Sequence, residues 1–208
     1  MKNQDQKNNI ILACKKLVDS GLISRTWGNI SCRIDEKTML ITPSGKDYHL
    51  INPDEIVEVN LSDCSYEGAI KPSVEKGIHA AIYNLKPEVN FIIHTHQNNA
   101  SAVGVLGEDV INLASSYPMF GEKILCAKYG LPGSKQLCRN VTECVKKSSS
   151  HAVVMVNHGA VCFGKDEVDA FTIAAQLEVA CEEFLIQKYK KISGQGTYCA
   201  EEMRTFAL

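Results

Sequence analysis

The chain has 208 residues, of which 45% are hydrophobic and 22% charged, and its formal net charge is -2. A chain of this length and balance can bury one sizeable core, as globular proteins do. The small net charge gives no broad basic face for a nucleic acid or an anionic membrane, so we expect neither partner. The polar first ten residues and the lack of a long apolar run predict no signal peptide and no membrane span.

Nine cysteines are scattered along the chain without a C-x-x-C pair. An odd, scattered set does not suit a disulfide framework. It predicts reduced thiols in a cytoplasm, most of them acting as small core hydrophobes. Neither an internal repeat nor a Gly/Pro/Ser-rich linker divides the sequence, so we expect a single domain over residues 1–208, with a mobile tail after about residue 192.

Helices and short strands alternate along the chain, with turn residues between them. The apolar spacing predicts helices over residues 8–20, 75–85, 133–147 and 166–189. Strands are expected near residues 29–34, 39–42, 56–61, 91–94, 123–126, 151–156 and 161–163. Sequential short strands flanked by helices predict an α/β sandwich with a mixed or largely antiparallel sheet.

The sharpest local signal for chemistry is His94-Thr95-His96, which ends the apolar run that begins at Phe91. On a strand, residues i and i+2 project to the same face, so both imidazoles would point into one space. This geometry suits a metal ion that binds two neutral imidazole nitrogens at once. Two hydrogen-bonded structural histidines are the alternative interpretation of an isolated H-x-H pair.

A second apolar run, residues 152–156, leads into the glycine turn Asn157-His158-Gly159. A turn histidine that caps the end of a strand is the alternative interpretation. Together with His94 and His96, however, His158 would complete an open three-histidine site with positions left for water or substrate. The other histidines lack such a setting and are expected to be surface or helix residues: His49, His79 and His151.

Glu75 follows Lys71-Pro72-Ser73-Val74 at the expected start of a helix. A carboxylate there interacts favourably with the helix dipole, and beside a divalent cation it could instead serve as metal ligand and general base. The sequence alone does not choose between these roles.

Two glycine turns, Trp27-Gly28-Asn29 and Thr42-Pro43-Ser44-Gly45, could present donors to a phosphate, although each alone is also typical of an ordinary turn.

Taken in order, five motifs resemble the class II aldolase and adducin-head family, and within it the L-fuculose-phosphate aldolases. They are Gly28-Asn29-Ile30-Ser31, Thr42-Pro43-Ser44-Gly45, Lys71-Pro72-Ser73-Val74-Glu75, His94-Thr95-His96 and Asn157-His158-Gly159. The resemblance covers about residues 8–190. It implies a three-layer α/β/α sandwich around a mixed, mostly antiparallel sheet. It also implies a homotetramer with active sites at the subunit interfaces.

The resemblance assigns roles to individual residues of this sequence. It implies that one zinc ion (Zn2+) per subunit is bound by His94, His96 and His158. Glu75 would ligate the metal at rest and become the catalytic base when substrate displaces it. The substrate phosphate would be held by Gly28, Asn29, Ser44, Gly45, Ser73 and Val74. Tyr129 matches the family's catalytic tyrosine, which reaches the neighbouring subunit's site; ordinary packing of Tyr129 is the alternative.

The implied reaction is the reversible cleavage of a ketose 1-phosphate, such as L-fuculose 1-phosphate, to dihydroxyacetone phosphate and an aldehyde. Val74 stands where such aldolases often carry a second serine, which removes one phosphate contact.

Two enzyme alternatives are a pentulose-phosphate 4-epimerase, which typically has Ser-Ser-Asp at positions 73–75, and a methylthioribulose-phosphate dehydratase. An adducin-like interaction module is the non-enzyme alternative, and the full set of metal ligands disfavours it.

Overall fold

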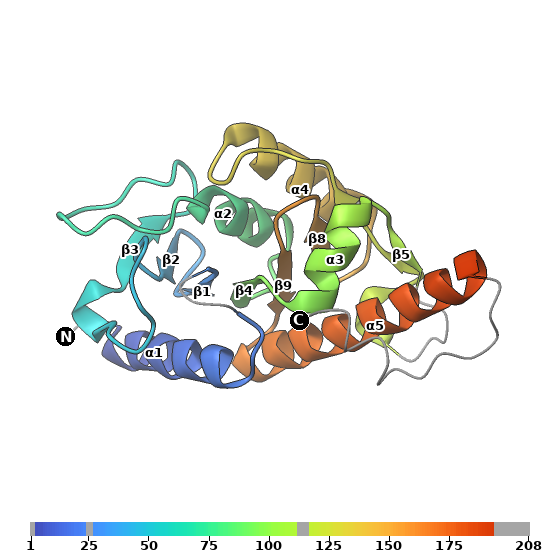
Figure 1. Ribbon diagram of the computed structural model, residues 1–208. Helices are drawn as coiled ribbons and strands as arrows, with labels where there is room; N and C mark the ends of the chain where they lie inside the picture. The colour runs from blue at the N-terminus through green and yellow to red at the C-terminus, as the bar shows by residue number, and fades with distance from the viewer. Residues whose placement is uncertain (1–2, 24–26, 112–116, 194–208) are drawn as a thin grey trace.

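A computed structural model describes residues 3–23, 27–111 and 117–193 (Figure 1). Its helices are α1 (Gln4–Asp19), α2 (Lys76–Leu85), α3 (Asn98–Leu106), α4 (Lys135–Lys147) and α5 (Glu167–Ser193). The strands of the main sheet are β1 (Asn29–Arg33), β2 (Thr38–Ile41), β3 (Val57–Asn60), β4 (Phe91–Thr95), β7 (Cys126–Ala127), β8 (Ala152–Met155) and β9 (Ala160–Gly164). A separate two-stranded sheet pairs β5 (Val110–Ile111) with β6 (Lys123–Ile124).

The main sheet has the strand order β3-β2-β1-β4-β9-β8-β7. Its neighbouring strands are antiparallel except for the parallel pair of β7 and β8. In Figure 1, α2 and α4 lie on one side of the sheet and α1 and α5 on the other. The structure therefore confirms the predicted three-layer α/β/α sandwich around a mixed, mostly antiparallel sheet.

Helices on both faces explain why the central strands are continuous apolar runs. Every residue of β4 and β9 is buried, whereas β3 at the edge alternates between buried and exposed residues. Within β4 the successive residues Ile92 and Ile93 enter different apolar clusters, one under α2 and α4 and the other under α1, α3 and α5. This alternation follows from the two-residue period of a strand.

Helix α3 and strand β5 were not expected from the sequence. Helix α3 consists mainly of small residues and has little amphipathic pattern, so no local signal marks it. Two distant contacts hold it in place. Glu178 of α5 accepts hydrogen bonds from the backbone N–H groups of Asn99 (2.7 Å) and Ala100 (3.2 Å), and Gly104 packs against the carbonyl of Met155. Tertiary contacts thus determine this helix more than its own sequence does.

Two general expectations can be compared with the described residues. Eight cysteines lie there, and all are free thiols, as the sequence predicted; Cys199 lies outside the described residues. Within the described ranges, each helix is too short or too polar to cross a membrane. The predicted tail after residue 192 lies almost wholly outside the described residues.

The turn between β8 and β9 packs against the end of β4, and Gly159 makes this approach possible. A Cβ atom on Gly159 would lie 2.2 Å from the carbonyl oxygen of Thr95 and 3.3 Å from Cε1 of His94. The turn is closed by a hydrogen bond from the N–H of Met155 to the carbonyl of Gly159 (2.8 Å). The close contact brings the turn that carries His158 next to His94.

We expect Gly159→Ala to lower the melting temperature, because the backbone atoms that its Cβ would meet cannot move aside without separating β4 from the turn. Overpacking of this kind costs about 1–3 kcal/mol. The matched control is Gly77→Ala in α2, where the added Cβ would meet only the Cys138 sulfur at 3.8 Å. That change should stabilise the helix by about 0.5–1 kcal/mol. Differential scanning calorimetry compares the two, and equal melting temperatures would contradict the steric argument.

Candidate metal centre and active-site cleft

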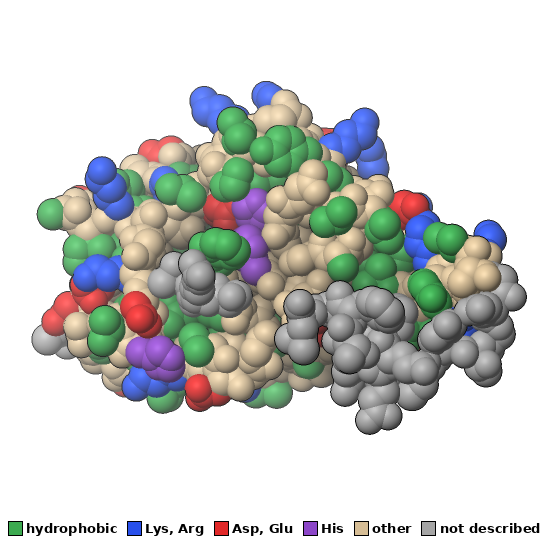
Figure 2. Space-filling view, viewed as in Figure 1, with side chains coloured by type: hydrophobic (Ala, Val, Ile, Leu, Met, Phe, Trp, Pro, Cys, Tyr) green, Lys and Arg blue, Asp and Glu red, His purple; other side chains and the backbone are tan. Residues whose placement is uncertain are grey.

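Three histidine side chains converge where β4 ends beside the β8–β9 turn. The antiparallel pairing places Thr95 opposite Ala160. His96, which follows β4, and His158, in the turn before β9, therefore lie at the same end of the sheet. The Nε2 atom of His94 lies 3.0 Å from Nε2 of His96 and 3.1 Å from Nε2 of His158. Figure 2 shows histidine side chains next to an acidic side chain in a hollow near the centre of this face.

The hydrogen bond of the His94 ring directs its lone pair toward the other two rings. Nδ1 of His94 lies 2.8 Å from the carbonyl oxygen of Ala160 and must donate to it, so a neutral ring carries its lone pair on Nε2. Burial lowers the pKa of His94, and burial with the neighbouring His94 and His158 lowers the pKa of His96 to about 3. Near neutral pH the rings of His94 and His96 are therefore neutral, and the single lone pair on His94 cannot satisfy two neighbouring rings.

Glu75 closes the fourth side of this cluster. Its Oε1 lies 3.0 Å from Nε2 of His158 and its Oε2 lies 3.2 Å from Nε2 of His94. Burial works to raise the pKa of this carboxyl, but His94, His158 and the amide of Asn29 outweigh it and hold the pKa below its ordinary value. The carboxylate thus faces a ring nitrogen that bears no proton, and a cation bound between them would satisfy both groups.

The donor set fits a divalent metal ion of the zinc type. His94, His96 and His158 each offer a nitrogen, the three ligand atoms lie within 4.8 Å of one another, and Glu75 adds a carboxylate oxygen. Oε1 of Glu75 is buried and lies 3.0 Å from Nε2 of His158, so a cation held by that nitrogen would also meet this oxygen. Three histidines with one exchangeable fourth ligand are typical of catalytic zinc sites.

Glu75 differs in position from the expectation. It was predicted within the first turn of a helix, and it is instead the N-cap residue of α2, with no capping hydrogen bond from its side chain. Its carboxylate therefore does not satisfy the N–H groups of α2. It extends into the metal cluster instead, where it is 6% exposed. The helix dipole alone does not account for this placement.

A cleft with a volume of about 460 Å³ lies over the metal cluster. Small-molecule sites generally have volumes of about 300–1,000 Å³. The cleft brings together all the predicted metal and phosphate residues with four others. The predicted residues are Gly28, Asn29, Ser44, Gly45, Ser73, Val74, Glu75, His94, His96 and His158, and the others are Trp27, Pro43, Pro132 and Asn157.

The predicted phosphate side of the cleft is formed by two segments held together through backbone hydrogen bonds. The N–H of Ser44 donates to Lys71 (2.9 Å) and the N–H of Ser73 donates to Thr42 (3.0 Å), so these two groups are not available to a ligand. The hydroxyls remain. Ser73 Oγ accepts from the N–H of Glu75 (3.2 Å) and keeps its own proton to donate. Within the described lining no residue is Lys or Arg, so a phosphate would meet neutral donors and the N-terminus of α2.

The Trp27-Gly28-Asn29 turn packs directly on β4. Gly28 has φ +141°, a conformation that residues with a side chain rarely adopt, and its Cβ would lie 2.7 Å from the carbonyl oxygen of His94. The turn places the Trp27 ring 5.8 Å from the His96 ring, with 56% of Trp27 exposed. The sequence indicated the turn but not the position of Trp27 on the rim of the cleft.

Tyr129 does not line the cleft of its own subunit within the described structure. It is 51% exposed, and its loop is fixed by Asn140 of α4, whose amide donates to the carbonyls of Lys128 (2.8 Å) and Tyr129 (3.0 Å). Its side chain is free to contact another molecule. The predicted role in a neighbouring subunit's site stays a prediction.

His79 is the residue whose setting was not anticipated from sequence. It is a helix residue, as predicted, but it is fully buried beneath the cleft. Its Nε2 lies 2.5 Å from Oδ1 of Asn29 and its Nδ1 lies 2.6 Å from Oγ of Ser31. The available signal was its spacing of four residues from Glu75, which places both side chains on one face of α2.

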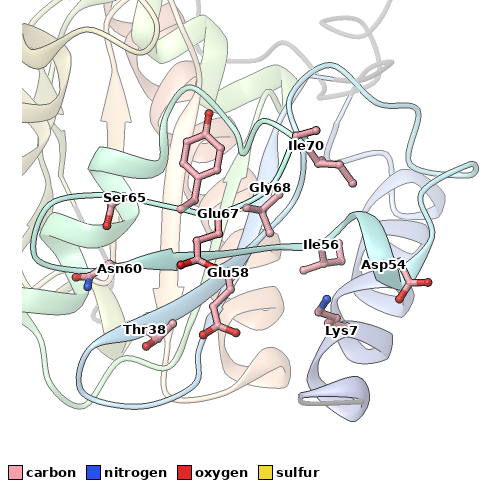
Figure 3. A pocket seen from close by; sticks show the side chains of 13 residues that line it. Lys7, Thr38, Asp54, Ile56, Glu58, Asn60, Ser65, Glu67, Gly68 and Ile70 are labelled. Atoms are coloured by element: carbon pink, nitrogen blue, oxygen red, sulfur yellow. The ribbon is translucent and has the colours of Figure 1, made fainter.

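A larger hollow of about 680 Å³ lies elsewhere, beside the edge strand β3. Figure 3 shows Lys7 and Asp54 at one end and Asn60 and Ser65 at the other, with Glu58 between them. Histidine does not occur in its lining, and the cluster of His94, His96 and His158 is the metal-ligand group found among the described residues. The smaller cleft therefore has the features of the functional site.

Known proteins show the same fold and sequence pattern. Residues 8–185 match the family described as Class II Aldolase and Adducin N-terminal domain. The chain is 31% identical to 5-deoxy-D-ribulose 1-phosphate aldolase of Bacillus thuringiensis, over 98% of this chain and 94% of that protein. It is also 31% identical to L-fuculose phosphate aldolase of Methanocaldococcus jannaschii, over 83% and 91% of the two chains. A solved L-fuculose 1-phosphate aldolase superimposes with a TM-score of 0.84 at 28% identity, over 98% and 94% of the chains.

The chain therefore belongs to the class II aldolase and adducin N-terminal domain family. Relatives named as aldolases align over most of its length, and it is an enzyme of the class II aldolase type, a carbon–carbon lyase.

We expect His158→Ala to weaken zinc binding by at least about 100-fold, because even the loss of an outer partner of a metal ligand costs 10–100-fold. The matched control is His49→Ala, which removes an exposed histidine outside the cleft. Competition with a fluorescent chelator gives the affinity, and atomic emission gives the zinc content of the purified protein. Unchanged zinc affinity in His158→Ala would contradict the three-histidine site.

Proposed function

We propose that the protein is a zinc-dependent aldolase that reversibly cleaves a ketose 1-phosphate of the L-fuculose 1-phosphate type to dihydroxyacetone phosphate and an aldehyde. It acts in the cytoplasm as a homotetramer with active sites at the subunit interfaces. The observation that carries this proposal is the carboxylate of Glu75 within 3.2 Å of two ligand histidines on the floor of a cleft. The neutral donors of Ser44 and Ser73 line the same cleft.

Glu75 is the group that moves the carbon-bound proton. In the direction of synthesis, one oxygen of its carboxylate takes a proton from the hydroxymethyl carbon of dihydroxyacetone phosphate. In the direction of cleavage, it returns a proton to the same carbon after the carbon–carbon bond breaks. The amide of Asn29 holds Oε2 (3.0 Å), which leaves Oε1 for this transfer. A bound zinc ion supplies the Lewis acidity that polarises the substrate carbonyl.

The phosphate fixes which carbon faces Glu75. Gly28 shapes the turn that presents Asn29, while Ser44, Gly45, Ser73 and Val74 complete the binding surface on the other side. A phosphate held there lies at the N-terminus of α2, where the helix dipole favours negative charge. Anchoring the phosphate orients the reacting carbon and lowers the entropic part of the barrier. Tyr129 of a neighbouring subunit exchanges a proton with the aldehyde oxygen.

Proton–deuterium exchange at the hydroxymethyl carbon of dihydroxyacetone phosphate in D₂O tests this function without knowledge of the aldehyde. The zinc-loaded protein should catalyse stereospecific exchange, and EDTA should abolish it until zinc is restored. Glu75→Gln should slow exchange by about 10²–10⁴-fold, the usual contribution of a general base. Glu67→Gln, which changes an exposed carboxylate outside the cleft, is the control. A zinc-loaded wild type without exchange would exclude the aldolase and favour the epimerase, the dehydratase or a binding module.

A second candidate substrate is 5-deoxyribulose 1-phosphate, which would leave acetaldehyde where L-fuculose 1-phosphate leaves L-lactaldehyde. The rim of the cleft favours this candidate. Four lining residues are not assigned to metal or phosphate, and three of them, Trp27, Pro43 and Pro132, present mainly apolar surface; the fourth is Asn157. A relative that aligns over 98% of the chain carries the name of this substrate.

Initial rates of synthesis with the two aldehydes distinguish the candidates. If the second candidate is correct, kcat/KM should be higher with acetaldehyde. Trp27→Ala should then lower kcat/KM by about fourfold, which corresponds to the free energy of burying one methyl-sized group of the substrate against the ring. Trp27→Phe should change kcat/KM less, because an aromatic ring remains. A preference for L-lactaldehyde of tenfold or more would instead support the L-fuculose 1-phosphate reaction.

A further inference from the structure

A chain of buried hydrogen bonds runs from Glu75 into the core between β1 and α2. Asn29 Nδ2 lies 3.0 Å from Oε2 of Glu75, and Asn29 Oδ1 lies 2.5 Å from Nε2 of His79. His79 Nδ1 lies 2.6 Å from Oγ of Ser31, which lies 2.9 Å from the hydroxyl of Tyr83. Each of these side chains is at most 6% exposed. The members beyond Asn29 do not line the cleft, and the aldolase mechanism gives them no role.

The carboxylate at one end of the chain fixes the direction of the first two bonds. An ionised carboxylate only accepts hydrogen bonds, so the group of Asn29 that faces Glu75 is the amide NH₂. The carbonyl oxygen of Asn29 then faces His79 and can only accept. The proton in this bond must therefore be on Nε2 of His79.

The charge state of His79 fixes the remaining bonds. Burial, reinforced by the nearby His94, lowers the pKa of His79 to about 3, so the ring is neutral and carries one proton. With that proton on Nε2, Nδ1 must accept, and the hydroxyl of Ser31 is its donor. The oxygen of Ser31 is then free to accept from the hydroxyl of Tyr83. All the donors in the chain thus point toward Glu75.

We propose that His79 is a positioning residue that sets the amide orientation of Asn29 and through it holds the carboxylate of Glu75 for proton transfer; this inference rests on the proposed role of Glu75 as the base. If the Nε2 donor is removed, the carbonyl of Asn29 loses its partner and the amide can rotate by half a turn. Rotation would place the Asn29 oxygen against the carboxylate, where two acceptors repel. It would also present an acceptor, instead of a donor, to a phosphate in the cleft that Asn29 lines.

The tautomer of His79 is measurable without any activity. Long-range ¹H–¹⁵N correlation spectra of the zinc-loaded protein with ¹⁵N-labelled histidine should contain one ring with a protonated Nε2 and an unprotonated Nδ1, insensitive to pH between about 5 and 8 because of its lowered pKa. The signal should be absent from His79→Gln, which assigns it. A protonated Nδ1 on this ring would overturn the proposal, because the hydrogen bonds would then run in the opposite direction.

The kinetic test compares two replacements of His79. His79→Gln keeps an N–H donor that can reach Asn29, whereas His79→Leu keeps the bulk and loses the donor. We expect His79→Leu to slow deuterium exchange by about 10–100-fold, the usual effect of removing an outer partner at a metal site, and His79→Gln to restore most of the rate. His151→Gln, a histidine outside the cleft whose ring bonds to the carbonyl of Phe163, is the control.

Zinc content and circular dichroism separate a positioning role from a structural one. Both His79 variants should retain one zinc per subunit and the wild-type spectrum, so the difference between them reports the Asn29 hydrogen bond. Equal losses of rate in the two variants, or a wild-type rate in His79→Leu, would overturn the proposal. A wild type without exchange would remove the proposed function instead, and the tautomer would still report whether the chain points toward Glu75.

Discussion

The pairing of β4 with β9 is the constraint on which the site depends. Its register sets Thr95 opposite Ala160 and His94 opposite Val161, so a histidine from each of two distant segments reaches one end of the sheet. A slip by one residue would turn His94 to the opposite face of the sheet. The carbonyl of Ala160 on the partner strand also accepts from Nδ1 of His94, so the same pairing selects the tautomer that presents Nε2.

This arrangement places charged and lone-pair groups together at a cost that the protein core alone does not offset. Glu75 is 6% exposed and ionised, and it faces the His94 ring, whose pKa burial lowers. The carboxylate and the unprotonated Nε2 of His94 lie 3.2 Å apart, so two groups that can only accept a hydrogen bond face each other. Metal binding would offset this cost, because one divalent ion could accept the lone pairs of the carboxylate and of the three nitrogens together.

The sequence predicted the parts of the structure that have a local signature. Strands β4, β8 and β9 are largely apolar because helices cover both faces of the sheet, and the three histidines lie at the end of β4 and in the turn between β8 and β9. What the sequence did not predict depends on contacts between distant segments. Helix α3 is held by Glu178 of α5, and the spacing of His79 within α2 does not distinguish a core position from a partner of Asn29. Glu75 was placed in a helix, but its direction depends on where β1 and β4 bring Asn29 and His94.

The two sides of the cleft differ in how their residues are held in place. On the metal side, Glu75 and His94 are fixed by hydrogen bonds to buried partners, so a change at any of them leaves a buried polar group unpaired. On the rim, Trp27 and Val74 are more than half exposed and make no such bonds within the described structure, so they can change at little cost in stability. Relatives named for fuculose and for deoxyribulose phosphates are each 31% identical to this chain, and a rim that tolerates substitution is compatible with different substrates on one fold.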